Sequence, residues 1–483
     1  MTMHRRHTAL PVRLALLSTT LAVVGCHLLD ISNPDVVPID LLGGPAALAT
    51  VRAGAIGDFT LAYSGSGAGG SGGTIEGQIM ASGLLADEWI NTETFPDRIQ
   101  VDARQTDPTS GTMANVFTDL SRARVAAENA VAQFRKFADT TKDAGLSETL
   151  SLAGLTYVMF AENYCSGVPF SNVQPDGTIQ YGTPLTTLQM LDTAIDRFNQ
   201  ALAAANILDT STASAKATRI SRLSLARVGK ARALLDAGRP ADADTVASAA
   251  GVATTFAYGV QHDLNSTRQQ NGVYNGDKKF KRYGVADLEG GNGLAWISAA
   301  DPRTPVFRSP STNKGFDNAT PQFDQYRYID EKASVTVATG AEARLINAEA
   351  ALQRGDTAGF LSILNGLRAA PPTYFLVGDP SLQTQTITAL APLAAPGSSG
   401  AAITMLFNER ARWLWLTAHR LNDLRRLVRA VGVRGGYGLA VNSVFPTGAY
   451  FKNGLTYGND VNLPVPVTEQ NNPHFKQCLD RLP

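Results

Sequence analysis

Few side chains in this sequence stand at the spacings that catalysis requires. Asp87 and Glu88 are adjacent acids, whereas glycoside hydrolysis needs two carboxyl groups about 5 Å, or roughly 6.5 to 9.5 Å, apart across a cleft. Adjacency does not establish such a pair, and solvated acids beside a helix end are the more ordinary interpretation. A surface glycosidase with Glu88 as an essential acid is therefore the last-ranked of the functions that the sequence suggests.

Histidine spacing gives no metal-binding pattern. Residues 27 to 483 contain four histidines, and no two of them lie at the spacing of metal ligands. They are His27, His262, His419 and His474. We therefore expect no metal site, no cofactor and no catalytic residue.

The glycine-rich stretch at residues 65–73 matches two functional patterns by composition alone. Gly65, Gly67 and Gly70 have dinucleotide-loop spacing, and residues 69–73 fit a nucleophile elbow. Both motifs require an apolar strand immediately before the glycines, and none is present. The stretch is predicted to be a flexible loop, and the chain is predicted not to be an enzyme.

The N-terminus has the three-part layout of a secretory signal. Three arginines precede an apolar run over residues 14–24, which ends at Gly25 and Cys26. The run is shorter than the roughly 20 apolar residues that a membrane-spanning helix needs. Residues 23–26, Val-Val-Gly-Cys, resemble a bacterial lipobox. We expect residues 1–25 to be a signal peptide and Cys26 to carry lipid; ordinary secretion with a chance cysteine is the alternative.

The remaining composition limits the other functions. Lysine plus arginine and aspartate plus glutamate are equal at 42 each, so charge does not indicate nucleic-acid binding. Cys165 and Cys478 would face an oxidising compartment after export. They could form a disulfide only if the end of the chain packs on its first half, and two buried free thiols are equally compatible with the sequence.

Apolar periodicity predicts a mainly helical protein. Residues 26–45 lack such a period and are expected to be a tether. Helices are expected from residue 46 and over residues 112–138, 147–164, 185–206, 218–236, 240–250, 340–354, 357–369 and 403–430. Residues 226–239 and 343–356 share alanine positions and a final glycine, and a short helix follows each. This resembles tetratricopeptide helix pairs, with coincidental alanine spacing as the alternative.

A loop-rich segment, residues 255–335, interrupts the helices and gathers aromatic residues. They are Tyr258, Tyr274, Phe280, Tyr283, Trp296, Phe307, Phe316, Phe323, Tyr326 and Tyr328. A second irregular segment, residues 431–460, adds Tyr437, Tyr450, Phe451 and Tyr457. Aromatic residues on loops above a helical scaffold suit recognition, because the scaffold positions the loops and the loops make the contacts.

Four segments resemble one family. Residues 408–426 contain Glu-Arg, then Ala-His-Arg and Asp-Leu-Arg-Arg, and resemble the Glu-Arg, Gly-His-Arg and Asp-Leu-Arg-Arg helix of the SusD/RagB outer-membrane nutrient-uptake lipoproteins. Residues 341–350 are similar to that family's Leu-Ile-x-Ala-Glu-Ala helix. Residues 157–170 are similar to its aromatic helix closing in Gly-Val-Pro, and residues 463–473 to its Pro-x-Pro, acidic, Asn-Pro ending. Ala418 departs from the family's glycine.

The resemblance implies a fold and a function. The fold would be a tetratricopeptide-like helical-repeat scaffold with a loop-rich, aromatic-bearing insertion. The function would be non-enzymatic capture of an oligosaccharide or similar nutrient at the outer face of the outer membrane, for a TonB-dependent transporter. Sugar rings stack on flat aromatic side chains, so the candidate ligand-binding residues are Trp89, Tyr274, Tyr283 and Trp296.

The expected organisation follows from these segments. Residues 46–254 would form an N-terminal SusD-like helical part, and residues 255–483 a C-terminal part with the aromatic insertion, packed together as one globular unit. A helical-repeat lipoprotein that binds a protein or peptide partner without glycan binding is the rival hypothesis, because its scaffold would be the same.

Overall fold

The computed structural model describes residues 43–67, 74–174, 178–308, 313–374, 376–378 and 384–483. The chain forms two units, Met1–Ala47 and Leu48–Pro483. Residues 1–25, Cys26 and the tether up to residue 42 lie outside the described residues, and the described part of the first unit contains one 3-10 turn, Pro45–Ala47. No helix in the described ranges has the length and apolarity needed to cross a membrane.

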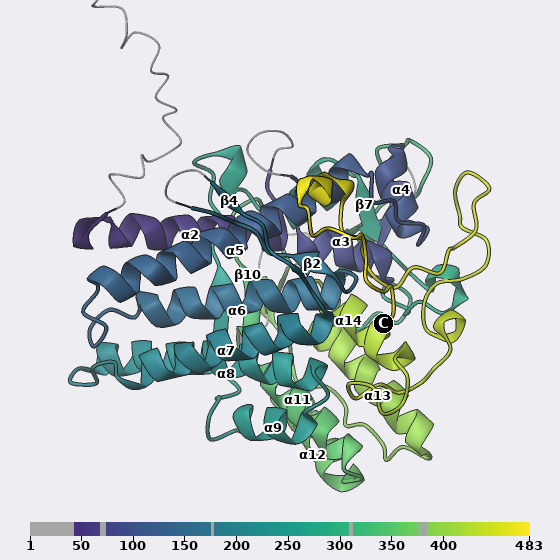
Figure 1. Cartoon of the computed structure of the whole chain (residues 1–483). Helices are drawn as coiled ribbons and strands as arrows, with labels where there is room; N and C mark the ends of the chain where they lie inside the picture. The colour runs from purple at the N-terminus through teal and green to yellow at the C-terminus, as the bar shows by residue number, and fades with distance from the viewer. Residues whose placement is uncertain (1–42, 68–73, 175–177, 309–312, 375, 379–383) are drawn as a thin grey trace, which may run out of the picture. The chain divides into compact units, whose positions relative to one another are not determined.

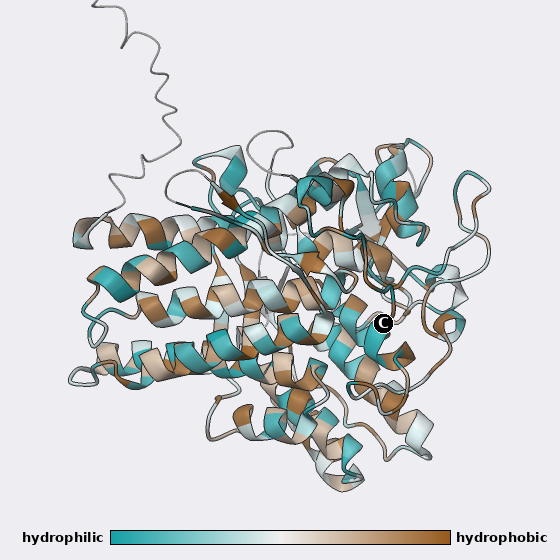
Figure 2. Ribbon diagram, in the orientation of Figure 1, coloured by the Kyte–Doolittle hydropathy of each residue, from teal (hydrophilic) through white to brown (hydrophobic). Residues whose placement is uncertain are grey.

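The second unit is built from helices that pack on their sequence neighbours. The helices are α2 (Leu48–Ser64), α3 (Gln78–Leu85), α4 (Pro96–Asp102), α5 (Gly111–Phe137), α6 (Gly145–Asn163), α7 (Thr187–Asn206), α8 (Ala213–Asp236), α9 (Pro240–Val246), α10 (Gly272–Tyr274), α11 (Gly340–Gln353), α12 (Thr357–Ala369), α13 (Ser399–Trp413) and α14 (Arg420–Val428). In Figure 1, α5, α6, α7 and α8 lie side by side, and the series continues through α9, α11 and α12. Figure 2 shows hydrophilic and hydrophobic residues on each of the long helices, as amphipathic packing requires. The predicted helical fold is confirmed.

The strands are short and pair only in twos among the described residues. The antiparallel pairs are β1 (Trp89–Asn91) with β7 (Tyr283–Val285), β2 (Val168–Pro169) with β5 (Pro184–Leu185), β3 (Asn172–Val173) with β4 (Ile179–Gln180), β6 (Ala257–Val260) with β10 (Val335–Thr339), β8 (Val306–Arg308) with β9 (Phe323–Gln325), and β11 (Leu376–Gly378) with β12 (Thr384–Thr386). Four of these strands, β6, β7, β8 and β9, lie in residues 255–335, the segment expected to be loop and short strand, and β10 begins at its last residue. Residues 255–335 contact the N-terminal part of the chain through the pairing of β7 with β1.

The two similar segments adopt the same local structure. α8 and α11 each end in a cap in which a glycine, Gly238 or Gly355, has a positive φ of 78° or 81°. In both caps two backbone N–H groups return to carbonyls of the last helical turn, the pattern in which glycine ends a helix. A buried ion pair joins the two helices, with the Arg232 Nε atom 2.6 Å from Oε1 of Glu342. The shared alanines and glycine therefore mark two copies of one helix-pair unit.

The segment with the family signature forms two helices, so the single helix predicted over residues 403–430 is wrong. α13 ends at Trp413 and α14 begins at Arg420. Between them Leu416 and Ala418 have left-handed backbone conformations, with φ of 55° and 60°, which cost an L residue roughly 1–2 kcal/mol. Ala418 stands where the resembling family has glycine, the residue that adopts this conformation without strain.

The corner between α13 and α14 is fixed by the two acids that follow α3. Both carboxylate oxygens of Asp87 accept hydrogen bonds from Arg420, at 2.6 and 2.7 Å. Oε1 of Glu88 accepts the backbone N–H of Leu416 at 2.9 Å, and the Tyr328 hydroxyl donates to the Leu416 carbonyl at 3.0 Å. Both acids are buried, so the strained corner is held by charged and polar contacts shielded from water.

α14 is charged and nevertheless buried along its whole length. All of its residues from Arg420 to Val428 are buried, although Figure 2 draws it as largely hydrophilic. Asp423 accepts hydrogen bonds from Arg410 and Arg426, and Arg426 also pairs with Glu349. Burial alone would raise the pKa of Asp423, but the two guanidinium groups lower it to about 2. Removing one member of such a network costs roughly 3–5 kcal/mol, because it leaves a buried charge unpaired.

Cys165 and Cys478 form a disulfide, with their Cα atoms 5.7 Å apart. The C-terminal segment packs beside the end of α6, where the Cys165 N–H donates to the Leu463 carbonyl and the Leu479 N–H to the Ser166 carbonyl, both at 2.8 Å. Of the two alternatives that the sequence left open, the structure has the pair. The disulfide closes the chain across a separation of 313 residues.

Glu88 should make stability depend on pH. Burial raises the pKa of Glu88 from 4.5 to about 8, so the folded protein holds a proton that the unfolded chain releases between these values. The stabilising contribution is present below about pH 4.5 and is lost as the pH rises through about 8. We expect the free energy of unfolding to fall with pH in this range, by at most about 1.4 kcal/mol per pH unit.

Urea denaturation at pH 5 and pH 8 measures this fall, and Glu88→Gln should flatten it because glutamine keeps the acceptor and carries no charge. Glu331→Gln, at a partly exposed acid outside this corner, is the control and should leave the slope unchanged. If the free energy of unfolding fell equally with pH in the wild type and in Glu88→Gln, Glu88 would not be the source of the pH dependence.

Glycine should be tolerated at Ala418 better than at an ordinary helical alanine. Ala418→Gly relieves backbone strain while losing a buried methyl group, whereas Ala411→Gly in α13 loses the methyl group with no strain to relieve. We expect Ala411→Gly to be more destabilising than Ala418→Gly by about 1–2 kcal/mol. Equal losses in chemical denaturation would show that Ala418 is not strained.

Candidate functional site

Three of the four aromatic residues predicted to bind ligand lie in the core. Trp89, Tyr283 and Trp296 are 0%, 0% and 2% exposed. Trp296 stacks on Trp415 with ring centroids 6.1 Å apart, and its indole N–H donates to the carbonyl of Asp87. Trp296 therefore supports the corner at α13 and α14, and none of the three buried rings offers a face to a ligand.

Tyr274, the fourth candidate, is partly exposed at the end of α10. It is absent from the residues that line the pocket described next. Asp87 and Glu88 are buried and engaged at the corner, so they cannot act on a substrate at the surface. The structure therefore gives no support to the glycosidase hypothesis that named Glu88.

Exposed aromatic rings gather at a different place, which we call the aromatic pocket. Phe95, Phe316 and Phe451 are 46%, 50% and 46% exposed. The rings of Phe95 and Phe316 stack with centroids 6.4 Å apart. Of these rings, Phe451 lines a hollow of about 450 Å³, and Phe95 and Phe316 directly follow and precede its lining residues Thr94 and Asp317. The hollow is lined by Glu93, Thr94, Ile99, Asp317, Ala319, Thr320, Pro321, Phe451, Lys452 and Asn453. Its volume lies within the usual range of small-ligand sites, roughly 300–1,000 Å³.

Three distant segments build the aromatic pocket. Phe95 sits between β1 and α4, where Pro96 begins the helix. Phe316 is held beside it because its N–H donates to the Lys281 carbonyl at 2.7 Å. Gly315, which directly precedes Phe316, packs against Thr92. A Cβ atom at position 315 would lie 2.3 Å from Cβ of Thr92. Glycine is therefore required for Phe316 to reach the ring of Phe95.

The third segment, residues 449–457, is tied down by tyrosines on either side of Phe451. The Tyr450 hydroxyl donates to Oδ2 of Asp102 at 2.6 Å, and the Tyr457 hydroxyl donates to Glu289 at 2.9 Å. Burial raises the pKa of Asp102 to about 6. These buried anchors hold the turn that carries Phe451 toward the pocket.

Charged groups flank the rings. The ammonium group of Lys452 lies 2.7 Å from Oδ2 of Asp317. Burial would raise the pKa of Asp317, but hydrogen bonds from Lys452, Thr320 and the backbone lower it to about 2. Glu93 pairs with Arg98 at 3.0 Å. The pocket thus places fixed hydrogen-bonding groups beside flat apolar faces.

Sequence reasoning found this pocket only in part. Phe316 and Phe451 stood among the loop aromatics of the two irregular segments, but Phe95 did not. The sequence carried one usable signal for Phe95, since an aromatic residue directly before a helix-starting proline is at a loop edge. Among the described residues, no three His, Cys, Asp or Glu side chains gather as metal ligands would.

The comparison with known proteins gives no match by sequence. No protein-family model matches this chain, and no curated protein matches it.

Solved structures give many matches to the fold. A SusD superfamily protein from Parabacteroides distasonis is 13% identical with a TM-score of 0.60, covering 89% of this chain and 98% of that one. A SusD superfamily protein from Bacteroides fragilis is 15% identical with a TM-score of 0.59, covering 90% and 99%. A SusD-like carbohydrate binding protein from Bacteroides vulgatus is 13% identical with a TM-score of 0.53, covering 79% and 83%. The chain therefore has the SusD-like fold.

Proposed function

We propose that this protein belongs to the SusD/RagB family and is a non-enzymatic surface lipoprotein that captures an oligosaccharide. The observation that carries the proposal is a hollow lined by the exposed ring of Phe451, next to the exposed stacked pair of Phe95 and Phe316, whose sequence neighbours Thr94 and Asp317 line the same hollow. Isolated exposed rings are common on protein surfaces. Here an exposed stacked pair belongs to the same two segments that line the hollow, and a third exposed ring lies in its wall. The SusD-like fold and the four family segments of the sequence agree with this proposal.

The chemistry of the pocket suits a sugar. The C–H faces of a sugar ring stack on flat aromatic rings, and the acids, amide and ammonium of Glu93, Asp317, Asn453 and Lys452 can bond its hydroxyls. Lys452 and Asp317 neutralise each other, which favours a neutral ligand over a highly charged one. One structure with the same fold is named as a carbohydrate binding protein, and we extend that activity to this chain.

Lipid on Cys26 would hold the protein at the outer membrane, facing the cell exterior. One acyl chain binds a membrane weakly, whereas two or three hold it firmly. The proposed partner is a TonB-dependent transporter of the SusC type, which would receive the captured sugar. Passing the captured sugar to a transporter requires both proteins to lie at the same membrane. The lipid anchor on Cys26 and the transporter partner are therefore proposed together.

Truncating the pocket rings should weaken glycan binding. In Phe95→Ala, Phe316→Ala and Phe451→Ala, each loss of a stacking face should raise Kd roughly 5- to 30-fold, equivalent to about 1–2 kcal/mol. A glycan array identifies the ligand for the wild type, and isothermal titration calorimetry gives each Kd.

Tyr181→Ala is the matched control, because Tyr181 is 39% exposed and lies outside the pocket. It should leave Kd unchanged. Absence of binding to any glycan, together with capture of a peptide ligand that the Phe316→Ala variant still binds, would favour the rival helical-repeat interaction protein.

The anchor is tested separately from the ligand. Cells making the wild type should incorporate labelled palmitate into the protein, which should fractionate with the outer membrane and be cut by added protease. Cys26→Ala should abolish the label, while Cys165→Ala with Cys478→Ala should keep it. Labelling of the Cys26→Ala variant would overturn the anchor and leave the aromatic pocket untouched.

A further inference from the structure

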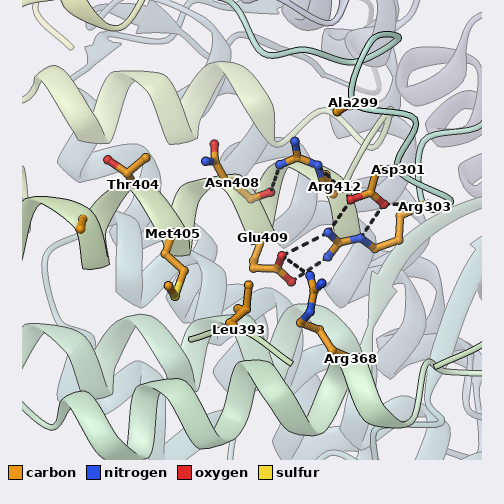
Figure 3. A pocket seen from close by; sticks show the side chains of 11 residues that line it. Ala299, Asp301, Arg303, Arg368, Leu393, Thr404, Met405, Asn408, Glu409 and Arg412 are labelled. Carbon is orange, nitrogen blue, oxygen red and sulfur yellow. Dashed lines mark hydrogen bonds and ion pairs between the residues drawn. The ribbon is translucent and has the colours of Figure 1, made fainter. Parts of the chain in front are cut away.

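A second hollow lies against α13 and is lined by arginine. Its volume is about 550 Å³, which suits a small ligand. Thr404, Asn408 and Arg412 follow one another at steps of four residues along α13 and so face the hollow together. Figure 3 shows these three side chains along α13, with Arg412 and Arg303 both at Asp301, and Arg303 and Arg368 both at Glu409. We call this hollow the arginine pocket; it shares no lining residue with the aromatic pocket.

The acids of the arginine pocket are fully occupied by its arginines. Asp301 accepts from Arg303 through both oxygens, and one of these oxygens lies 3.0 Å from Nε of Arg412. Glu409 accepts from Arg303 at 2.7 and 3.1 Å and from Arg368 at 2.7 Å. Three guanidinium groups thus face two carboxylates, so the wall carries one positive charge in excess.

The excess charge resides on two arginines with donors to spare. Arg412 uses Nε for Asp301 and Nη1 for the Asn408 carbonyl at 3.2 Å, and Arg368 uses Nε for the Ala391 carbonyl and Nη1 for Glu409. Within the described ranges of the chain, neither Nη2 atom has a partner. The two side chains are only 17% and 15% exposed, so water screens them weakly.

Arg412 shares its two neighbouring carboxylates with other arginines. Burial lowers the pKa of Arg412; Asp301 and Glu409 raise it, whereas the positive charges of Arg303 and Arg420 lower it. An anion bound at Nη2 would relieve this repulsion. A carboxylate oxygen can accept a charge-assisted hydrogen bond from such a free Nη2 group, and such bonds are stronger than those between neutral groups.

We propose that the arginine pocket binds a small hydroxylated monocarboxylate, the chemistry of a uronic acid. One excess positive charge matches one carboxylate. The amide of Asn408 has no partner among the described residues, and Oγ1 of Thr404, which donates to the Gly400 carbonyl at 3.0 Å, can still accept a hydrogen bond. These groups suit ligand hydroxyls, and Met405 and Leu393 offer apolar contact to a ring. This site goes beyond sugar capture at the aromatic pocket and does not depend on it.

Calorimetric titration of the whole protein with glucuronate, glucose and sulfate tests the proposal. Glucuronate should bind saturably and more tightly than the other two. Arg412→Gln should weaken glucuronate binding 10- to 100-fold, because it removes a hydrogen bond from a charged donor. Arg354→Gln, at an exposed arginine paired with Asp244 outside the pocket, should change Kd less than twofold.

Thr404 supplies a second variant, at an exposed side chain whose substitution leaves the core unchanged. Thr404→Glu places a carboxylate at the mouth of the pocket and should weaken glucuronate binding at least 10-fold, while the neutral Thr404→Gln should not. Equal losses in both variants, sulfate binding as tight as glucuronate, or no glucuronate binding by the wild type would overturn the proposal. Loss of glucuronate binding in Phe316→Ala alone would also overturn it, by assigning the ligand to the aromatic pocket.

Discussion

The structure depends on a buried charge pair between Asp87 and Arg420, which lie 333 residues apart in the sequence. Two charges removed from water are costly unless each is fully paired, so this contact admits one arrangement of the chain. Glu88 beside it accepts a hydrogen bond from the backbone N–H of Leu416. These contacts stabilise the strained corner between α13 and α14. The cost of the left-handed residues is offset by contacts that only this docking provides.

This corner explains why the large aromatic residues Trp89 and Trp296 are buried. Trp296 lies against Arg420 and Trp415, where its ring shields the Asp87 pair from water, so it cannot also serve as a binding surface. Trp89 directly follows the two acids and is buried with them. The proposed ligand contacts are therefore smaller rings on the loops that leave this core. Phe95 follows β1 by a few residues, and the β1–β7 pair brings the aromatic segment beside it.

The two pockets differ in the charge of the ligand that they suit. At the aromatic pocket, Lys452 and Asp317 balance each other beside exposed apolar rings, which suits neutral rings with hydroxyls. At the arginine pocket, Asp301 and Glu409 are paired with neighbouring arginines, and Nη2 of Arg412 is left as a hydrogen-bond donor for a ligand. The exposed residues of each pocket, such as Phe451 and Thr404, lie on a loop or a helix face, where substitutions can change the ligand without altering the Asp87–Arg420 pair. A fold with this division can keep its scaffold while its specificity varies.

The sequence by itself determined the helical class, the positions of most helices and the resemblance to the SusD-like fold, because these follow from local periodicity and short motifs. The paired caps at Gly238 and Gly355 were readable for the same reason, since a cap is a contact between near neighbours. Tertiary structure alone decided that α14 is buried on both faces, that Cys165 meets Cys478, and that Trp89 lies inside while Phe95 lies outside. Each of these depends on which distant segment covers a residue, and a one-dimensional pattern of hydrophobicity carries no information about that partner.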